Sequence, residues 1–430
     1  MKRYYLIFCS LVCILLTSCG GSGGGDNGGG NDGEPTKPQL GKVLPDWSEG
    51  YLDIHAVNTG RGECSLIIFP DGTTMMVDVA SANTANEAEE GEEGGGATPV
   101  KPYGTEPVET VINYVSHFIE AASGKLDYLM LSHWHGDHIG GPPDAATMDM
   151  HSSGQFILCG VTRVGTEFEV GKLIDRGNTY PRAVGTIGVT NYFKYVNWIT
   201  AQGNTVREEA VVGPTTQVVM KVNPSAYSNF TIRNVCKNGY IWTGDGTDGS
   251  KNTFSTVPAE LAKVDENKLS IGFLMKYGKF DYFSGGDISY SGRSTMGLWA
   301  DIEASLSTVM PQVEVMKAHH HGTANCNSAE LLKAAKPNAI IAHVWQDVQP
   351  NPATVTRMFT ANKECNIFTT NLTENNKATL GASTVAKLKS TGGHVVVRVS
   401  PGGDQYCIYV LNDNNENYIV QRILGPFDCK

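Results

Sequence analysis

The sequence predicts a layered α/β fold in which strands and helices alternate through two halves of the chain. Three observations lead to this class. Short β-rich segments separated by turn residues open the body of the chain, strand and helix patterns alternate after them, and further strand patterns close it. The composition, 40% hydrophobic and 18% charged, is typical of globular proteins and excludes a wholly disordered chain of 430 residues.

The first half is predicted to begin with a three-stranded meander. Its strands are rich in β-branched residues and are separated by Asn58-Thr-Gly-Arg-Gly62 and Pro70-Asp-Gly72, both typical of turns. An exposed loop rich in Ala, Glu and Gly follows at 81–107. The elements predicted here are strands at 51–57, 64–69 and 74–79, a helix at 108–122 and a buried strand at 126–131.

The second half is predicted to repeat the alternation after an elaborated middle. In the middle, strands are expected at 156–161 and 211–222, and a helix at 192–201. The elements predicted beyond it are a hairpin at 269–277 and 280–283, strands at 313–317 and 339–343, helices at 329–335 and 352–361, and a terminal meander at 395–399, 406–411 and 417–423.

The N-terminus is predicted to carry an export signal. A positive start is followed by thirteen apolar residues at 4–16, which is too short to span a bilayer and typical of a signal peptide. The following Leu16-Thr-Ser-Cys19 resembles a bacterial lipobox, which implies cleavage before Cys19 and its acylation. We therefore expect a signal peptide at 1–18, a glycine-rich tether at 19–48 and one domain at 49–430. By resemblance to lipoprotein sorting signals, Gly20 favours the outer membrane over the inner one, and the glycine-rich tether with acidic residues after Cys19 favours display at the cell surface.

The charge balance argues against general nucleic-acid binding. The net charge is -11 over the whole chain, so the broad basic field that a stable nucleic-acid partner requires is lacking. After residue 20 there is no apolar window of the ~18 residues that a spanning helix needs, which excludes a polytopic membrane protein. The remaining partners are the membrane, through the lipid anchor, and a small-molecule or cell-wall substrate.

The most informative segment follows the predicted strand at 126–131 and reads Ser132-His-Trp-His-Gly-Asp-His-Ile-Gly-Gly141. His133 and His135 are two apart and Asp137 and His138 are adjacent, whereas neighbours on one helix face are three or four residues apart. A tight loop leaving a strand end, with a glycine to relieve strain, brings such side chains together. Imidazole and carboxylate ligands of this kind suit zinc, with manganese or iron as alternatives. We therefore expect a metal site formed by His133, His135, Asp137 and His138.

This His-x-His-x-Asp-His string resembles the signature of the metallo-β-lactamase-fold hydrolases, which implies an αββα sandwich. Asp78, at the end of a predicted strand, is similar to the family's first-motif aspartate, and Asp287 to its metal-bridging aspartate. Residues 52–63 and the stretch Lys317-Ala-His-His-His-Gly-Thr323 resemble one branch of that family. That branch contains the hydrolase domain of DNA-uptake competence proteins and the bacterial phosphorylcholine esterases. The middle, about 160–265, would be an insertion.

The resemblance implies a centre for two divalent metal ions, zinc in the first instance. The implied ligands are His133 and His135 for the first ion, Asp137, His138 and His321 for the second ion, and Asp287 as the bridge between them. Asp78 would orient the metal loop through hydrogen bonds. Asp137 and His320 are the expected catalytic residues, with His320 lining the site and stabilising or protonating the leaving group. His319 has the weakest claim to a role.

The chain departs from the family pattern in two places. Many members supply a third histidine to the first ion from the stretch before the bridging aspartate, where this chain has only His151, in a predicted surface loop. A late ligand of the competence branch is replaced by Asn351, and asparagine is a poor zinc ligand. We therefore expect a weaker first site, completed by water or by His320. His343 is a further candidate ligand, although a core position is expected for it.

Three functions remain open at this stage. The first is a membrane-anchored phosphodiesterase that uses a metal-bound hydroxide on a choline-phosphate-like, teichoic or nucleic-acid diester. The second is a lactonase or β-lactamase-type hydrolase of the same fold. The third is a surface lipoprotein that keeps the fold, binds a partner and has no catalytic activity.

Overall fold

A computed structural model describes residues 37–81, 97–141, 144–254, 258–290 and 298–430. The predicted signal peptide, Cys19, the first part of the predicted tether and much of the predicted acidic loop lie outside these residues. A search of the described helices finds none that combines the length and the apolar character needed to cross a membrane.

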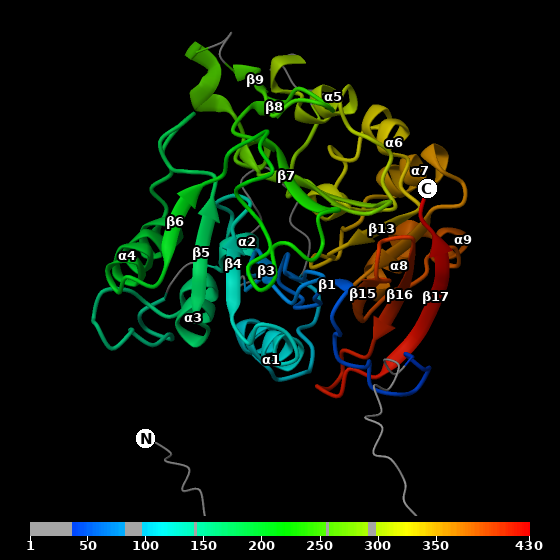
Figure 1. Ribbon diagram of the computed structural model, residues 1–430, viewed down its shortest axis with the longest axis horizontal. Helices are drawn as coiled ribbons and strands as arrows, with labels where there is room; N and C mark the ends of the chain where they lie inside the picture. The colour runs from blue at the N-terminus through cyan, green and yellow to red at the C-terminus, as the bar shows by residue number, and fades with distance from the viewer. Residues whose placement is uncertain (1–36, 82–96, 142–143, 255–257, 291–297) are drawn as a thin grey trace, which may run out of the picture. The chain divides into compact units, whose positions relative to one another are not determined.

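The first sheet has nine strands and mixes antiparallel with parallel pairing (Figure 1). Its order is β17-β16-β15-β1-β2-β3-β4-β5-β6, and β3 to β6 run parallel to one another. The strands are β1 (Leu52–Ala56), β2 (Ser65–Ile68), β3 (Thr74–Val77), β4 (Leu126–Met130), β5 (Val170–Asp175), β6 (Val206–Glu209), β15 (His394–Val399), β16 (Gln405–Leu411) and β17 (Val420–Asp428).

The second sheet has eight strands in the order β14-β13-β12-β11-β10-β7-β8-β9. Its strands β11 to β14 run parallel, and the remaining pairs are antiparallel. The strands are β7 (Phe230–Lys237), β8 (Tyr240–Trp242), β9 (Ser250–Asn252), β10 (Gly272–Tyr277), β11 (Phe280–Ser284), β12 (Val315–Lys317), β13 (Ala339–Ala342) and β14 (Asn366–Thr369).

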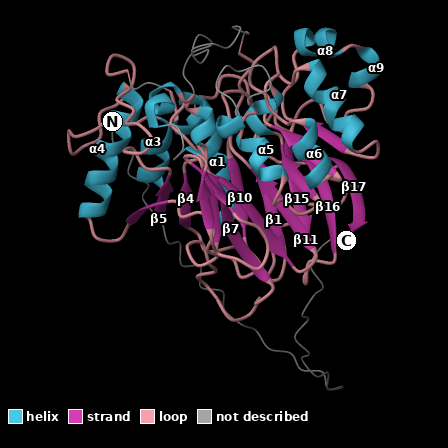
Figure 2. Cartoon of the chain, turned by 90° about the horizontal axis from the view of Figure 1, so that it is seen from above, coloured by secondary structure: helices cyan, strands magenta, loops and turns pink. Residues whose placement is uncertain are grey.

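The helices are short, and several follow a capping residue. Ser328 caps α6 by accepting a hydrogen bond from the N–H of Leu331, and Asn351 caps α7 in the same way from Ala353. The helices are α1 (Pro107–Ile119), α2 (Gly136–Ile139), α3 (Gly160–Glu167), α4 (Ile187–Ala201), α5 (Ile302–Ser307), α6 (Ala329–Ala335), α7 (Pro352–Ala361), α8 (Glu374–Leu380) and α9 (Ala382–Val385). Figure 2 shows the strands gathered in the middle, with α3 and α4 at one end and α7 to α9 at the other.

Three buried cores separate four layers. Between the sheets, Met75 and Tyr128 of the first sheet belong to the same core as Met275 and Tyr282 of the second. A second core joins the opposite face of the first sheet to α1, α3 and α4, and a third joins the opposite face of the second sheet to α5, α6 and α7. The fold is therefore the αββα sandwich that the resemblance implied.

Most predicted elements outside the middle of the chain are confirmed, including α6 and α7 with the predicted bounds. The strand predicted at 156–161 is wrong, because the chain turns into α3 there: the Cys159 N–H donates to Thr162 Oγ1 in a capping box. A short apolar run cannot distinguish a buried strand from a helix start. The strand predicted at 211–222 is also wrong, since Gly213 and Pro214 interrupt it.

Strands of the middle of the chain belong to both sheets. β5 and β6 extend the first sheet, and β7 pairs with β10 in the second sheet. The folded part also begins before residue 49, the predicted start of the domain. The Gly41 N–H donates to the Val420 carbonyl, and Leu44 is buried in the core beside α1.

Candidate metal centre

The candidate ligands lie where parallel strands end. The carboxyl ends of neighbouring parallel strands meet at one edge of a sheet, so residues just beyond them converge. Five strand ends contribute in this way: Asp78 follows β3, His133 to His138 follow β4, Asp287 follows β11, His319 to His321 follow β12, and His343 follows β13. The two sheets therefore deliver their polar residues to a common place.

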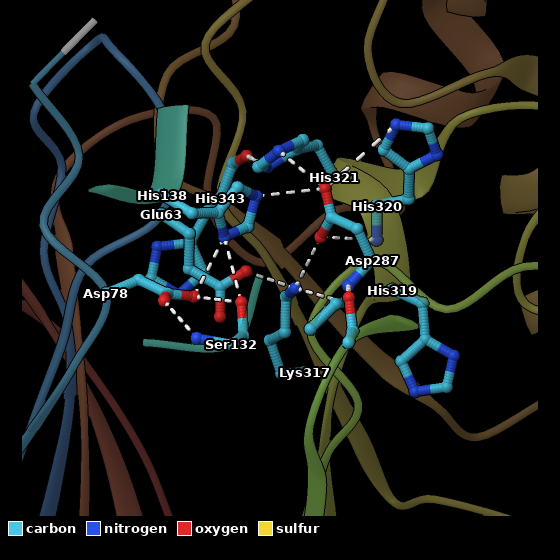
Figure 3. Close-up of polar contacts among 12 residues, drawn as sticks. Glu63, Asp78, Ser132, His138, Asp287, Lys317, His319, His320, His321 and His343 are labelled. Atoms are coloured by element: carbon cyan, nitrogen blue, oxygen red, sulfur yellow. Dashed lines mark hydrogen bonds and ion pairs between the residues drawn. The ribbon is translucent and has the colours of Figure 1, made fainter. Parts of the chain in front are cut away.

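Four of the predicted ligands form a compact buried group, the second-ion cluster of Asp137, His138, Asp287 and His321. Figure 3 shows His138 and His321 turned toward Asp287. His138 Nε2 lies 3.0 Å from Asp287 Oδ2. His321 Nε2 lies 2.9 Å from Asp137 Oδ2 and 3.2 Å from Asp287 Oδ2. Each of the four side chains is at most 4% exposed.

The spacing of these atoms fits a metal ion. Ligands about 2.0–2.1 Å from a tetrahedral zinc lie about 3.3 Å from one another. The cluster's nitrogen–oxygen separations run from 2.9 Å to 3.8 Å, the longest being His138 Nε2 to Asp137 Oδ2. Asp137 Oδ1 is buried and has no hydrogen-bond partner among the described residues. The donor set and its geometry therefore fit a divalent cation.

Asp78 orients the metal loop. Its Oδ1 accepts from the Ser132 N–H at 2.7 Å, and its Oδ2 accepts from Ser132 Oγ at 2.7 Å and from His138 Nδ1 at 2.8 Å. Donation from Nδ1 leaves His138 Nε2 facing the second-ion cluster. Asp78 holds a left-handed backbone conformation, φ 59°, which is costly for a residue with a Cβ. The surrounding hydrogen bonds stabilise this conformation.

His321 is oriented by a comparable device on the other sheet. Its Nδ1 donates to the carbonyl of His343 at 2.8 Å, so that Nε2 points to the carboxylates. The turn that carries it is left-handed at two successive residues, with φ 49° at His320 and φ 53° at His321. Gly322 completes the turn at φ 84°, and a Cβ there would lie 2.7 Å from Pro350. The sequence His-His-Gly therefore fits one narrow turn against the following loop.

The predicted first-ion ligands form a looser set. His133 Nε2 lies 3.0 Å from His135 Nδ1, and His135 Nδ1 lies 2.8 Å from Asn267 Oδ1. Asn267 Nδ2 in turn lies 3.3 Å from His320 Nε2. We call His133, His135, Asn267 and His320 the first-ion group. His135 is only partly buried, in contrast to the second-ion cluster.

Sequence reasoning missed two residues that support this group. Asn267 stands in the middle of the chain, where no motif marked it. Its neighbour Glu266 accepts from the Trp134 N–H at 3.1 Å, between the two histidines of the loop. Arg176 holds Glu266 with two donors, at 2.6 Å and 2.9 Å. A Glu-Asn pair before a lysine carries no recognisable spacing, so only the fold could reveal this role.

The remaining candidate histidines lie away from the second-ion cluster. His319 points away from it in Figure 3, and its Nδ1 lies 2.9 Å from Glu303 Oε1. His343 Nε2 lies 3.5 Å from Ser65 Oγ, and burial lowers the pKa of its imidazole to about 4. His151 stacks on Phe156 in an outer loop.

The position predicted to replace a family ligand is also explained. Asn351 stands where the competence branch has a late histidine. Its side-chain oxygen accepts a hydrogen bond from the Ala353 N–H at the N-terminus of α7. Its backbone N–H donates to the Gly322 carbonyl at 2.9 Å. Asn351 therefore supports the His320-His321 turn through the backbone rather than as a ligand.

The carboxylates of the cluster favour positive charge at its nitrogens. Burial opposes protonation of His138, yet Asp287, Asp137 and Asp78 hold its pKa well above the ordinary value. The pKa of His321 is also raised, to about 9. Burial alone would lower this pKa, but the Asp287 and Asp137 carboxylates raise it by more than burial lowers it. Because a divalent cation delivers positive charge to the same nitrogens, the electrostatics match the geometry.

A buried ion pair adjoins the bridging position. Lys317 Nζ contacts both Glu63 and Asp287, and both Lys317 and Glu63 are 1% exposed. Glu63 lies in the opening turn that resembled the family branch, and Lys317 opens its His-His-Gly stretch. Neither Glu63 nor Lys317 was predicted as a site residue, although both belong to the two segments, 52–63 and 317–323, that resemble the family branch.

Comparisons with known proteins add structural likenesses at low identity. No protein-family model and no curated protein matches the sequence. A CmlA beta-hydroxylase mutant is 11% identical over 75% of this chain, with a TM-score of 0.37, and this chain spans only 53% of it. An isothiocyanate hydrolase from Delia radicum gut bacteria is 13% identical over 80% of this chain and 98% of its own, TM-score 0.36. Unliganded yeast PDE1 is 9% identical over 81% of this chain and 99% of its own, TM-score 0.37.

Proposed function

We propose that the chain is a metal-dependent hydrolase and that its substrates are phosphodiesters. The observation that carries the proposal is the second-ion cluster, in which four buried side chains from both sheets place their ligand atoms at metal-binding separations. A buried group of two carboxylates and two imidazoles is costly without a cation, because the charges are removed from water. Its assembly is therefore best explained by a metal ion.

The two cations, when bound, supply an activated water and neutralise charge that develops on the substrate. Asp137 can accept the proton of the attacking water at Oδ1, since its Oδ2 is directed at His321. His320 can hold a proton for the leaving oxygen at Nε2, which lies 4.0 Å from Asp287 Oδ2. Its Nδ1 lies 2.9 Å from Thr323 Oγ1, which fixes the ring.

Phosphodiesters are favoured over other hydrolysable bonds by the motifs of the centre. The stretch His319-His-His-Gly-Thr323 and the opening turn at 58–63 resemble the branch of competence-protein hydrolases and phosphorylcholine esterases. In-line displacement at phosphorus needs positioning, charge neutralisation and a proton donor rather than a side-chain nucleophile. Within the predicted domain at 49–430 the sequence contains no Gly-x-Ser-x-Gly pattern, which supports a metal route over a serine route.

A substrate panel combined with metal analysis tests this proposal. We expect purified protein to contain divalent metal and to hydrolyse bis(p-nitrophenyl) phosphate or p-nitrophenyl phosphorylcholine faster than lactones or cephalosporins. His133→Ala should abolish the activity, whereas His151→Ala, a histidine outside the centre, should keep it. Preferential hydrolysis of lactones or cephalosporins would move the assignment to the second class. Metal-free protein without hydrolytic activity would favour a binding protein.

We also propose, from the sequence, that acylated Cys19 anchors the domain to the outer membrane or the cell surface, where it meets small-molecule or cell-wall diesters. Two acyl groups on one cysteine provide stable membrane attachment. Mass spectrometry of the mature N-terminus should show a diacylglyceryl cysteine. Cys19→Ala should abolish the modification and release the protein from membranes, while Cys13→Ala, inside the predicted signal, should not.

A further inference from the structure

The buried lysine beside the centre uses all its donors on site residues. Lys317 Nζ donates to the Gly286 carbonyl at 2.7 Å and to Asp287 Oδ1 at 3.2 Å, and its third partner is the Glu63 carboxylate. The side chain is 1% exposed. Figure 3 shows it lying between Glu63 and Asp287. The ammonium is therefore held in one place from three directions.

These contacts divide the two oxygens of Asp287 between different tasks. Oδ1 receives Lys317 Nζ at 3.2 Å and the His320 backbone N–H at 3.1 Å. Oδ2 instead faces the imidazoles, 3.0 Å from His138 Nε2 and 3.2 Å from His321 Nε2. The carboxylate plane is thus fixed, and one oxygen is directed at the predicted cation positions.

Glu63 completes the arrangement from a third segment of the chain. It is 1% exposed, and its side-chain oxygens have no hydrogen-bond partner among the described residues apart from the ion pair with Lys317. Its backbone N–H donates to the Asp137 carbonyl at 3.0 Å. The Glu63–Lys317 pair therefore ties the opening turn to both carboxylate ligands of the second-ion cluster.

We propose that Lys317, paired with Glu63, is a positioning residue that occupies Oδ1 of Asp287 and thereby reserves Oδ2 for the cations. The inference rests on the proposed function in so far as Asp287 is a metal ligand, and it concerns metal binding rather than the reaction. With Oδ1 occupied, Asp287 offers a single oxygen. Without Lys317, the carboxylate can rotate and offer both oxygens to one cation.

The proposal predicts that removal of Lys317 changes the metal affinity in the direction opposite to that expected from charge repulsion alone. A positive charge close to a cation site weakens cation binding, so its removal should strengthen binding if Lys317 acts by charge alone. If Lys317 acts by positioning, its removal should weaken binding, because Asp287 loses its fixed orientation. The direction of the change in metal affinity therefore decides between the two.

Two variants and one control test the proposal in the full-length folded protein. Lys317→Met leaves Glu63 buried without its partner, so this variant risks poor folding. The double variant Glu63→Gln with Lys317→Met removes both charges of the pair and avoids that problem. It leaves the net charge beside the site unchanged, so weaker metal binding by this variant reports the lost orientation, and the sign of the charge effect is read from Lys317→Met. Lys237→Met is the control, because Lys237 is also largely buried but pairs with Glu209, outside the centre.

The measurements are zinc and manganese affinity, by competition with a chromogenic chelator, and the visible spectrum of the cobalt-loaded protein. We expect the double variant to bind zinc at least about tenfold more weakly. The cobalt absorption should lose intensity, because a bidentate Asp287 raises the coordination number. The control should match the wild type in both measurements.

Unchanged or tighter zinc binding by the folded double variant, with an unaltered cobalt spectrum, would overturn the proposal. A wild type that binds no divalent cation would overturn it as well. The proposed function has a separate outcome: a wild type that binds metal but hydrolyses no diester contradicts the reaction and leaves the role of Lys317 intact.

Discussion

The two halves of the candidate centre differ in how firmly their ligands are held. Each ligand of the second-ion cluster is at most 4% exposed, and His138 and His321 each donate from Nδ1 to a fixed oxygen. In the first-ion group, His135 is partly buried and its neighbour is an amide, Asn267, rather than a third histidine. Both halves stand at strand ends, but the first-ion group also depends on Asn267, which lies in a short 3-10 turn.

This difference indicates that the second-ion cluster and the first-ion group have unequal affinities for metal. Ligands fixed by hydrogen bonds lose little freedom when a cation binds, so the second-ion cluster should bind more tightly. An amide oxygen is a harder and weaker ligand than imidazole for zinc, which suits manganese or magnesium better. We therefore expect one tight and one weak site, with Asp287 serving both.

Loss of the shared ligand should have the largest effect. Asp287→Ala removes the carboxylate that the resemblance implies as the bridge, which belongs to the second-ion cluster and lies 4.0 Å from His320 Nε2. We therefore expect loss of bound metal and a fall in diester hydrolysis of at least about 10³-fold. Elemental analysis and initial rates would measure both. Asp281→Asn, in the strand β11 that precedes Asp287, is the control, because burial raises the pKa of the Asp281 carboxyl to about 6 and an amide is a mild replacement. If the Asp287→Ala variant retained its metal, Asp287 would not be the ligand that the two halves share.

Removing one ligand from each half should separate the two sites. His321→Ala should lose the tightly held metal, whereas His135→Ala should retain about one ion per chain after dialysis against a weak chelator. Both variants should lose most hydrolysis. Elemental analysis of the two proteins in parallel gives the answer, and the reverse order of metal loss would show that the first-ion group is the tighter site.

The orienting carboxylate should have a smaller effect than a ligand. Asp78→Ala releases His138 Nδ1 and the Ser132 N–H, so we expect zinc affinity to fall by about 10–100-fold at the second site. Chelator competition measures this change. Asp78→Asn, which keeps one acceptor oxygen, should lie between Ala and wild type. Equal affinity of all three proteins would mean that His138 is oriented by other contacts.

The smallest expected change is an increase in zinc affinity at the first-ion group. Asn267→His places an imidazole between His135 and His320, so zinc affinity at the first site should rise by roughly tenfold. Stoichiometry under a zinc buffer should move from about one to about two ions per chain. A variant that stays at one ion would show that Asn267 is not directed at a cation.

The elements outside the middle and the second-ion cluster could be predicted because their signals are local. Buried strands, the helices at 329–335 and 352–361 and the spacing of His133 to His138 are visible in single segments, and the family resemblance linked these histidines to Asp287 and His321. The first-ion group could not be completed in this way. Glu266 and Asn267, just after the middle segment, reach the loop only through tertiary packing, because the residues around them have no strong periodicity.

The middle segment shows why tertiary context decides such cases. β5 reads Val-Gly-Lys-Leu-Ile-Asp, with a glycine and a lysine in a half-buried strand, and β6 is rich in charge. β5 is held by pairing with β4, and β6 by pairing with β5, rather than by intrinsic preference. Lys317 and Glu63 likewise form a pair across 254 positions of the chain, which no local pattern reveals.

The most direct test of the centre is anomalous diffraction from crystals soaked separately in zinc and manganese. The account predicts a strong peak about 2.0–2.2 Å from ligand atoms of Asp137, His138, Asp287 and His321, with a weaker second peak near His133 and His135. Maps in which these side chains keep their positions but no peak lies among them would contradict the account.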